Sequence, residues 1–287
     1  MKVLVTGGTG TVGGAVTREL LKRGEHVRVL ARKQPEKGKL PTKVEVAIGD
    51  LMDPVSLEKA MEGMDKLFLL NAVVPDELTQ ALIAYGIAKR KGIQHIVYLS
   101  VFKVEQFRDV PHFASKAAVE NTLQEFGVPY TILRPGYYLQ NDARLKDALT
   151  GVGIYPIPIG TAGICAVDVR DIAEAAATSL TTDGHNGQTY DLVGPSLITG
   201  PGNAAIWSRL LGKEIQYTGH NFDQWEMQMR SMVPAWTAYD FRTMFEGYYD
   251  RGFASTDNQV ARLTNLLGHA PRSYESFAQE TAALWNS

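Results

Sequence analysis

Residues 6–14 read Thr6-Gly7-Gly8-Thr9-Gly10-Thr11-Val12-Gly13-Gly14. This loop follows a short apolar run at 3–6 and leads into a helical pattern at 12–23, so Gly7, Gly10 and Gly13 recur every third residue between a strand and a helix. In such loops the first glycine permits a tight turn, the second lets the backbone approach a pyrophosphate, and the third lets the helix pack closely on the strand. The loop therefore predicts a dinucleotide site, with a tight turn that binds no ligand as the alternative. The residues expected to contact the dinucleotide here are Thr6, Gly7, Thr9, Gly10, Thr11, Val12 and Gly13.

The rest of the amino-terminal half alternates short β-branched runs with longer amphipathic ones. Strands are expected at 3–6, 26–31, 44–48, 67–71, 95–100 and 130–133, and helices at 12–23, 54–61, 77–91 and 115–126. Strands that are nearly continuous in apolar residues and separated by helices indicate a parallel sheet covered on both faces. The predicted fold class is therefore α/β, a Rossmann-type doubly wound parallel sheet.

The chain changes character after Arg134-Pro135-Gly136. Residues 151–158 are rich in glycine and proline and are expected to form a loop, whereas 168–180 is typical of a helix and 189–193 of a strand. From Gly200 onward the pattern is mostly helical and rich in tryptophan, methionine and tyrosine. We therefore divide the chain into a dinucleotide-binding domain at 1–150, with segments to about residue 195 returning to it, and a smaller, mostly helical cap at 196–287 that binds the substrate.

Composition excludes several classes of protein. The 287 residues are 45% hydrophobic, and 29 lysines and arginines face 31 aspartates and glutamates, so there is no net basic charge to attract nucleic acid or an anionic membrane. Cys165 is the only cysteine, which rules out an internal disulfide and a cysteine-based metal cluster, and no metal is expected. No apolar stretch approaches the roughly 20 residues of a membrane-spanning helix, and the start of the chain does not resemble an export signal. A cytoplasmic location is therefore expected.

The end of the second expected strand distinguishes between the two nicotinamide dinucleotides. Sites for NAD carry an acidic residue about 20 positions after the glycine loop, where it bonds the ribose, but this chain has Ala31-Arg32-Lys33 there. A guanidinium can hold a ribose phosphate with two charge-assisted bonds, and a carboxylate would repel it. We therefore expect NADP(H) to be preferred and NAD(H) to be a weaker ligand, with Arg32 and Lys33 at the phosphate. A solvated basic turn is the alternative.

Further motifs point to one family. They are Gly49-Asp50-Leu51, Val97-Tyr98-Leu99-Ser100, His112-Phe113-Ala114-Ser115-Lys116, Val128-Pro129-Tyr130-Thr131-Ile132-Leu133-Arg134-Pro135-Gly136, Val167-Asp168-Val169-Arg170-Asp171-Ile172-Ala173 and Gly187-Gln188-Thr189-Tyr190-Asp191-Leu192. Together with the glycine loop they resemble the short-chain dehydrogenase/reductase superfamily, in particular its atypical NmrA-like branch. That branch includes bacterial NAD(P)H:quinone reductases and isoflavone-reductase-like enzymes. The similarity extends to roughly residue 195 and is thin beyond it.

The resemblance implies further cofactor contacts. It places Asp50 and Leu51 at the adenine, and Asn71 and Ala72 beside the cofactor, because the carboxyl ends of strands line the ligand crevice in such sheets. Each polar residue also has an ordinary alternative. Asp50 could cap the helix that follows it, and Asn71 could close a turn.

The superfamily's Tyr-x-x-x-Lys pair is altered in this chain. In the superfamily the tyrosine protonates the substrate oxygen and the lysine assists it, but here His112 stands at the tyrosine position and Lys116 follows four residues later. The resemblance implies that Lys116 reaches the nicotinamide ribose, and in isoflavone-reductase-like enzymes a lysine at this place is itself the proposed acid or base. His112 could donate or relay a proton, or it could be an ordinary residue on the helix surface. Lys116 could alternatively pair with Glu120 one turn on.

Three hydroxyl groups complete the candidate catalytic set. Ser100 ends the fifth expected strand, where the superfamily often has a serine that binds the substrate carbonyl, although it could instead satisfy a loop backbone. Tyr137 and Tyr138 follow Pro135-Gly136, and either hydroxyl could replace the missing tyrosine, although both could be packing aromatics. The candidate catalytic residues are therefore Lys116, His112, Ser100, Tyr137 and Tyr138.

The function predicted from these features is an NADP(H)-dependent oxidoreductase that transfers hydride to a small conjugated acceptor such as a quinone, an enone or an imine-like compound. Such acceptors do not demand a strong acid, and an apolar cap suits a small apolar or aromatic substrate. The alternative is a non-catalytic NADP(H)-sensing regulatory protein, which would need a protein partner. A nucleotide-sugar epimerase is less favoured because it needs the missing tyrosine as a base. A homodimer is left open, and no nucleic acid or membrane partner is expected.

Overall fold

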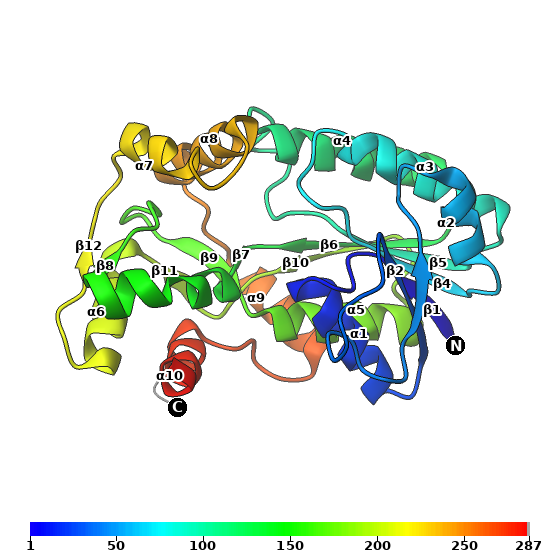
Figure 1. The fold of residues 1–287 in the computed structure, drawn as a ribbon, viewed down its shortest axis with the longest axis horizontal. Helices are drawn as coiled ribbons and strands as arrows, with labels where there is room; N and C mark the ends of the chain where they lie inside the picture. Colours follow the sequence, from blue (N-terminus) through cyan, green and yellow to red (C-terminus); the bar gives the residue numbers. More distant parts are fainter. Residues whose placement is uncertain (286–287) are drawn as a thin grey trace.

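A computed structural model describes residues 1–285, and its centre is a seven-stranded sheet (Figure 1). The strands are β1 (Lys2–Val5), β2 (His26–Ala31), β3 (Glu45–Ile48), β4 (Lys66–Leu69), β5 (His95–Leu99), β6 (Tyr130–Pro135) and β10 (Gln188–Leu192). They are all parallel and lie in the order β10-β6-β5-β4-β1-β2-β3. The chain reverses direction across the sheet between β1 and β4, and in doubly wound sheets the carboxyl ends of the strands at such a reversal form the ligand crevice.

Helices cover both faces of this sheet. Three of them, α2 (Pro54–Met61), α3 (Glu77–Arg90) and α4 (Pro111–Glu125), lie on one face, and α1 (Thr11–Lys22) and α5 (Val169–Thr181) lie on the other (Figure 1). Successive residues of a strand point to opposite faces, so Val3 and Val5 join the apolar cluster under α1 and α5 while Leu4 joins the one under α2 and α3. The predicted α/β class is confirmed, and each expected strand and helix of this half is present.

Helix α4 begins earlier than the pattern indicated. It starts at Pro111, four residues before the expected start at Ser115. Proline is favoured in the first turn of a helix because the amide hydrogen it lacks would have no helical partner there. As a result His112 and Lys116 both lie on α4, one turn apart.

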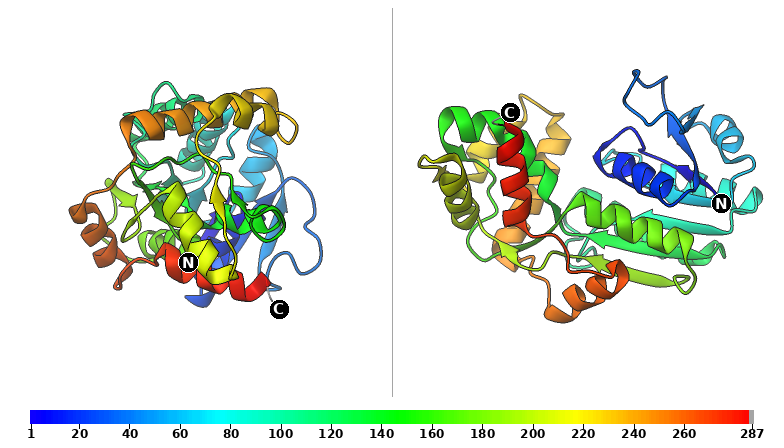
Figure 2. Two further views of the ribbon diagram at one scale, coloured as in Figure 1. Left: turned by 90° about the vertical axis from the view of Figure 1, so that its left-hand side faces the viewer. Right: turned by 90° about the horizontal axis from the view of Figure 1, so that it is seen from below.

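The carboxy-terminal part is mostly helical, as expected. It contains α6 (Gly200–Leu211), α7 (Phe222–Met229), α8 (Ala235–Arg251), α9 (Asp257–Leu267) and α10 (Tyr274–Trp285). Helix α10 lies along α6, whereas α9 packs on α5 and β10 of the sheet (Figure 2). The boundary at residue 196 stays a prediction, and α9 is a segment beyond it that returns to the nucleotide-binding part of the chain.

Short strands connect the two parts. They are β7 (Tyr137–Tyr138), β8 (Ile154–Tyr155), β9 (Ile164–Val167), β11 (Leu197–Ile198) and β12 (Gln216–Tyr217). Strand β9 joins β7 and β11 in a three-stranded sheet, and β8 pairs with β12, so the expected loop at 151–158 contains one short strand. Among residues 1–285, no helix is both long enough and apolar enough to cross a membrane.

A buried carboxylate lies where the segment after β7 meets helix α10. Asp142 is fully buried and accepts hydrogen bonds from the hydroxyls of Tyr137, Tyr155 and Tyr274 at 2.7, 2.8 and 2.5 Å. Burial raises the pKa of Asp142, and the three hydrogen bonds act in the opposite direction. This cluster fastens β7, β8 and α10 to the segment at Leu139–Leu145.

Candidate active site

The glycine loop has the geometry of an anion site. Gly7 adopts a left-handed φ of +65°, and a Cβ added to Gly13 would lie 2.3 Å from the Gly7 carbonyl oxygen, so both positions require glycine. A Cβ added to Gly10 would meet only that same oxygen, at 3.3 Å, and would otherwise face open space. Gly10 is also the N-cap of α1 and supplies no capping side chain. The first amides of α1 are therefore available to a pyrophosphate that fits over Gly10.

Two cavities meet at this loop, at the carboxyl ends of the strands. The outer cavity, of about 220 Å³, is lined by Thr6, Gly7, Thr9, Leu30, Arg32, Gly49, Asp50, Leu51, Leu70, Ala72, Val74 and Gln80. The inner cavity, of about 270 Å³, is lined by Gly7, Gly10, Thr11, Val12, Gly13, Leu70, Asn71, Val73, Leu99, Lys116, Tyr138, Gln140, Asn141 and Arg144. Gly7 and Leu70 border both, so one extended ligand could occupy the two cavities and cross the loop between them. Every cofactor residue expected from the sequence lines one of the two, with the exception of Lys33.

The outer cavity carries an unpaired cation at its rim. Arg32 is exposed, and its guanidinium has no ion pair or hydrogen bond with any residue in the range 1–285. The carboxylate of Asp50 accepts the backbone N–H of Met52 at 2.8 Å. Asp53 is the residue that caps α2, by accepting the N–H of Val55, so the alternative reading of Asp50 as a helix cap is wrong.

The inner cavity contains a buried ion pair. The ammonium Nζ of Lys116 lies 2.6 Å from Oε1 of Glu77, the first residue of α3, and Glu77 is fully buried. Glu120 bonds instead to Arg134, whose Nε lies 3.0 and 3.2 Å from its two carboxylate oxygens. The alternative pairing of Lys116 with Glu120 is therefore wrong.

Several buried polar atoms near the inner cavity have no partner among the described residues. They are Oδ1 of Asn71, Oε2 of Glu77, the hydroxyl of Tyr98 and Oγ of Ser100. Asn71 lines the cavity, and its side-chain amide donates to Oε1 of Gln80 at 3.2 Å, which leaves Oδ1 free to accept a hydrogen bond from a ligand. Ser100 is buried and lies outside both cavities. An unsatisfied buried acceptor is costly, so the free oxygen of Asn71 fits a polar ligand in this cavity.

The two tyrosines of β7 have different surroundings. Tyr138 lines the inner cavity, whereas the hydroxyl of Tyr137 donates to the buried carboxylate of Asp142. Burial raises the pKa of Tyr138, and the negative charge of Glu77 raises it further. Tyr138 thus lines the same cavity as Lys116 and the glycine loop, whereas the hydroxyl of Tyr137 is bound to Asp142 and lies outside both cavities.

His112 is buried and lies outside both cavities. Its backbone N–H bonds Oδ1 of Asp240 at 2.9 Å, and its ring Nδ1 lies 2.5 Å from Oδ2 of the same carboxylate. Asp240 belongs to α8 and is fully buried. The alternative reading of His112 as a helix-surface residue is therefore wrong, because the side chain fastens α8 to the first turn of α4.

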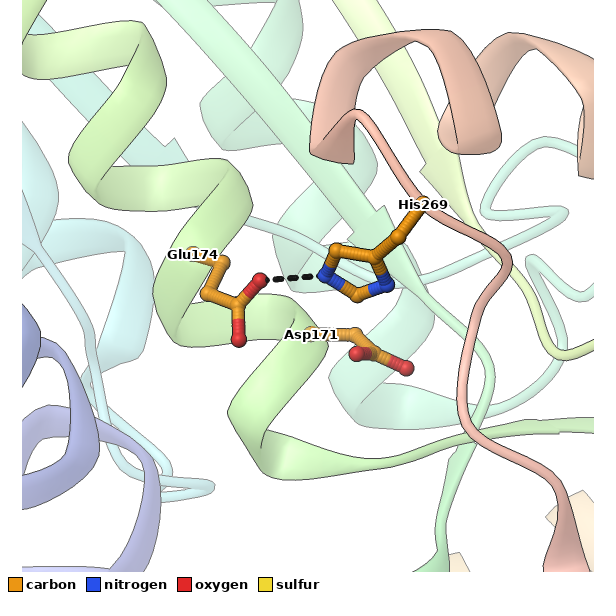
Figure 3. A group of neighbouring side chains, drawn as sticks. All are labelled: Asp171, Glu174 and His269. Atoms are coloured by element: carbon orange, nitrogen blue, oxygen red, sulfur yellow. Dashed lines mark hydrogen bonds and ion pairs between the residues drawn. The ribbon is translucent and has the colours of Figure 1, made fainter.

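One cluster outside the cavities contains metal-ligand side chains. Ligand atoms of Asp171, Glu174 and His269 lie within 4.8 Å of one another (Figure 3). Arg272 pairs with both carboxylates, and the two nitrogens of His269 bond Glu174 and the carbonyl of Ala270 at 2.6 and 2.8 Å. The hydrogen bond to Glu174 is the main cause of a raised pKa of His269. These groups already satisfy one another, so the cluster is an ion-pair tie between α5 and the segment that follows α9.

Sequence reasoning missed several groups at the site. Glu77 stands at the start of a predicted helix, and nothing local connects it with Lys116, which lies 39 positions further on. Gln140, Asn141 and Arg144 line the inner cavity from the 3-10 segment after β7. The polar run Gln140-Asn141-Asp142, which follows Leu139, was the available signal for that group.

Comparisons with known proteins show the family of the chain. Residues 1–278 match the model of the NmrA-like family. The chain is 29% identical over 289 residues to an NAD(P)H azoreductase of Xenophilus azovorans, with 99% of each chain covered. It is 31% identical over 284 residues to a (4-alkanoyl-5-oxo-2,5-dihydrofuran-3-yl)methyl phosphate reductase of Streptomyces griseus, with 98% of each covered. The crystal structure of the Escherichia coli quinone oxidoreductase QOR2 with NADPH superposes with a TM-score of 0.87 at 25% identity over the whole of both chains. Because the family model spans nearly the whole sequence, the chain belongs to the NmrA-like family.

Proposed function

We propose that this protein is an NADP(H)-dependent reductase that transfers hydride to a small conjugated acceptor such as a quinone, an enone or an imine-like compound. The observation that carries the proposal is the position of Lys116, whose ammonium lines the same cavity as the glycine loop. A proton donor and a dinucleotide site thus share one space. The relatives named as an azoreductase and as an NADPH-dependent quinone oxidoreductase support the same class of reaction.

Residues of both cavities would hold the dinucleotide. In this proposal Arg32 binds the ribose phosphate, Asp50 and Leu51 lie at the adenine, and the pyrophosphate lies over Gly10 at the start of α1. Asn71 accepts a hydrogen bond in the inner cavity with its free Oδ1. The unpaired guanidinium of Arg32 supports NADP(H) rather than NAD(H) as the preferred form, whereas the open space over Gly10 fits the pyrophosphate of either.

The bound cofactor supplies a hydride, and the chain's own residues provide for the proton. Lys116, whose Nζ lies 2.6 Å from the carboxylate of Glu77, is the donor that we propose. Tyr138 is a weaker acid than a free tyrosine because burial and Glu77 raise its pKa, so it contributes a hydrogen bond rather than a proton. Quinones also accept protons from water after hydride transfer, which lessens the need for a strong acid.

The proposal is tested with purified protein, NADPH and a panel of one quinone, one enone and one azo dye, by following the loss of NADPH absorbance. We expect oxidation with at least one acceptor and a large loss of turnover in Lys116→Met. A protein that binds NADPH tightly and reduces none of the three would contradict the proposal and favour an NADP(H)-sensing regulatory protein.

A further inference from the structure

We propose that Glu77 is a positioning residue for proton transfer, and that the pair Glu77 and Lys116 does in this chain what a tyrosine and a lysine do in the wider superfamily. This inference rests on the proposed function, because it concerns the proton that accompanies the hydride. It assigns to a residue of α3 a part in a reaction for which the sequence pointed only to α4 and the strand ends.

The geometry places the carboxylate behind the ammonium. Lys116 lines the inner cavity, whereas Glu77 is fully buried and is not part of the cavity wall. The distance of 2.6 Å from Oε1 to Nζ is that of a strong charge-assisted hydrogen bond. Glu77 therefore fixes the direction of the lysine side chain from behind and leaves the other ammonium hydrogens for groups in the cavity.

The charges around the pair leave Glu77 as the counter-ion of Lys116. No aspartate or glutamate among residues 1–285 lines the inner cavity. Glu120, the nearest acid along α4, is bound through both oxygens to Arg134. Without Glu77 a buried ammonium would lose its counter-charge, and the side chain would no longer be held in this direction.

The pair is poorly suited to a purely structural purpose. A buried ion pair repays its desolvation only when its remaining atoms are also bonded, and Oε2 of Glu77 has no partner in the described part of the chain. Tyr98 also borders the pair: burial and the charge of Glu77 raise the pKa of its hydroxyl, and Nζ of Lys116 lies 5.8 Å from the centre of its ring. Two apolar residues would stabilise this position at least as well, so the pair is better explained by what Lys116 does in the cavity.

The proposed reaction transfers one hydride and one proton to the acceptor, and the proton comes from Lys116. NADPH would be the reductant and would become NADP⁺ on giving up a hydride, which brings two electrons and forms a C–H or N–H bond on the acceptor. One N–H bond of Lys116 breaks as its proton moves to the oxygen or nitrogen that has gained the negative charge. Lys116 is then a neutral amine beside the Glu77 carboxylate. A proton from water in the cavity restores the ammonium before the next turnover.

The test compares two acceptors in wild type and in Glu77→Gln. An enone needs both a hydride and a proton, whereas a cationic triphenylmethane dye becomes its neutral leuco form on gaining a hydride alone. We expect Glu77→Gln to lower kcat for the enone at least about tenfold and to change kcat for the dye little, with the dissociation constant for NADPH nearly unchanged. Glu77→Asp should recover part of the enone activity. Glu58→Gln serves as a control, because it removes a carboxylate from a surface ion pair with Arg90.

Other results would overturn the inference. Equal losses for enone and dye, or full enone activity in Glu77→Gln, would show that Glu77 does not act on the proton. If Glu77→Gln does not fold, the same comparison is made with Glu77→Asp and with the charge-free double variant Glu77→Gln/Lys116→Met. In these variants too, kcat should fall more for the enone than for the dye. If wild type reduces neither of these acceptors and also fails with the quinone and the azo dye of the panel above, the proposed function fails first and the inference falls with it. If wild type reduces the azo dye but not the enone, the azo dye takes the place of the enone, because its nitrogens also need a proton.

Discussion

The imidazole Nδ1 of His112 lies 2.5 Å from Oδ2 of Asp240 and joins the first turn of α4 to α8 of the cap. The position that carries a proton-donating tyrosine in the superfamily therefore holds, in this chain, a residue that fastens two parts of the molecule together. Because Lys116 follows one turn later on α4, this contact also steadies the helix from which Lys116 reaches the cavity.

Replacing His112 with phenylalanine should lower stability more than cofactor affinity. Among the described residues, the variant leaves the fully buried Asp240 carboxylate with only the backbone N–H of residue 112 as a partner, which should cost about 2 kcal/mol in the free energy of unfolding. Urea denaturation measures that loss, and the dissociation constant for NADPH should change little. Unchanged stability together with a large loss of NADPH binding would contradict this account of His112.

Replacing Arg32 with glutamate should reverse the choice of cofactor. The variant removes a guanidinium from the rim of the outer cavity and adds a charge that repels a ribose phosphate, so NADPH affinity should fall by about 2 kcal/mol, or roughly thirtyfold. Affinity for NADH should be retained. Lys33→Glu is the matched control, because Lys33 is also exposed but lines neither cavity, and its effect should be smaller. Calorimetry that finds the same NADPH affinity in Arg32→Glu as in wild type would rule out Arg32 as the phosphate ligand.

Replacing Gly10 with leucine should abolish cofactor binding and leave the fold intact. The Cβ of the new side chain would meet only the Gly7 carbonyl, at 3.3 Å, among the described residues, and the side chain would extend into the space over the loop. Circular dichroism reports the fold, and quenching of protein fluorescence reports NADPH binding. Gly151→Leu is the control, because a Cβ there meets nothing within 4 Å. A folded Gly10→Leu protein that binds NADPH normally would show that the pyrophosphate lies elsewhere.

Stability should fall as the pH drops below 6.5 because of His95. Burial lowers the pKa of His95 from its ordinary 6.5 to about 4, and the nearby Lys66 and His185 act in the same direction. The hydroxyl of Thr131 donates to the carbonyl of His185, so its oxygen accepts from Nε2 of a neutral His95. Because the pKa of His95 is lower in the folded protein, the unfolded chain binds a proton at this residue at a higher pH than the folded protein does. The contribution of neutral His95 to the free energy of unfolding is therefore complete above pH 6.5. It is lost as the pH falls from 6.5 to about 4, and the loss is at most about 3 kcal/mol.

The measurement for His95 is urea denaturation as a function of pH in wild type and in His95→Gln. Wild type should lose more stability than the variant over that window, since glutamine does not titrate. Parallel curves for the two proteins would show that His95 does not carry this dependence. His269 should act in the opposite sense, because its raised pKa adds stability at low pH that is lost as the pH rises.

The parts of the fold that depend on local pattern could be predicted from the sequence. The glycine loop and the apolar strands are continuous segments, so their conformations are dictated by neighbouring residues. Contacts between distant segments could not be predicted in this way. Glu77 meets Lys116 across 39 positions and Asp240 meets His112 across 128, and each contact exists only because the tertiary fold brings two helices together. The same limit applies to Tyr137 and Tyr138, whose different environments depend on the cap that packs around them.

The most direct test of the central claim follows the hydride itself. Purified protein is incubated with NADPH deuterated on one face or the other of the nicotinamide C4, with an enone or a cationic triphenylmethane dye as acceptor, and the product is analysed by mass spectrometry. The account predicts one deuterium on a carbon of the product from one of the two labelled forms and none from the other, because a protein-bound nicotinamide presents a single face to the acceptor. A product without deuterium from either form, or bound NADPH that is never oxidised, would contradict the assignment of this protein as a reductase.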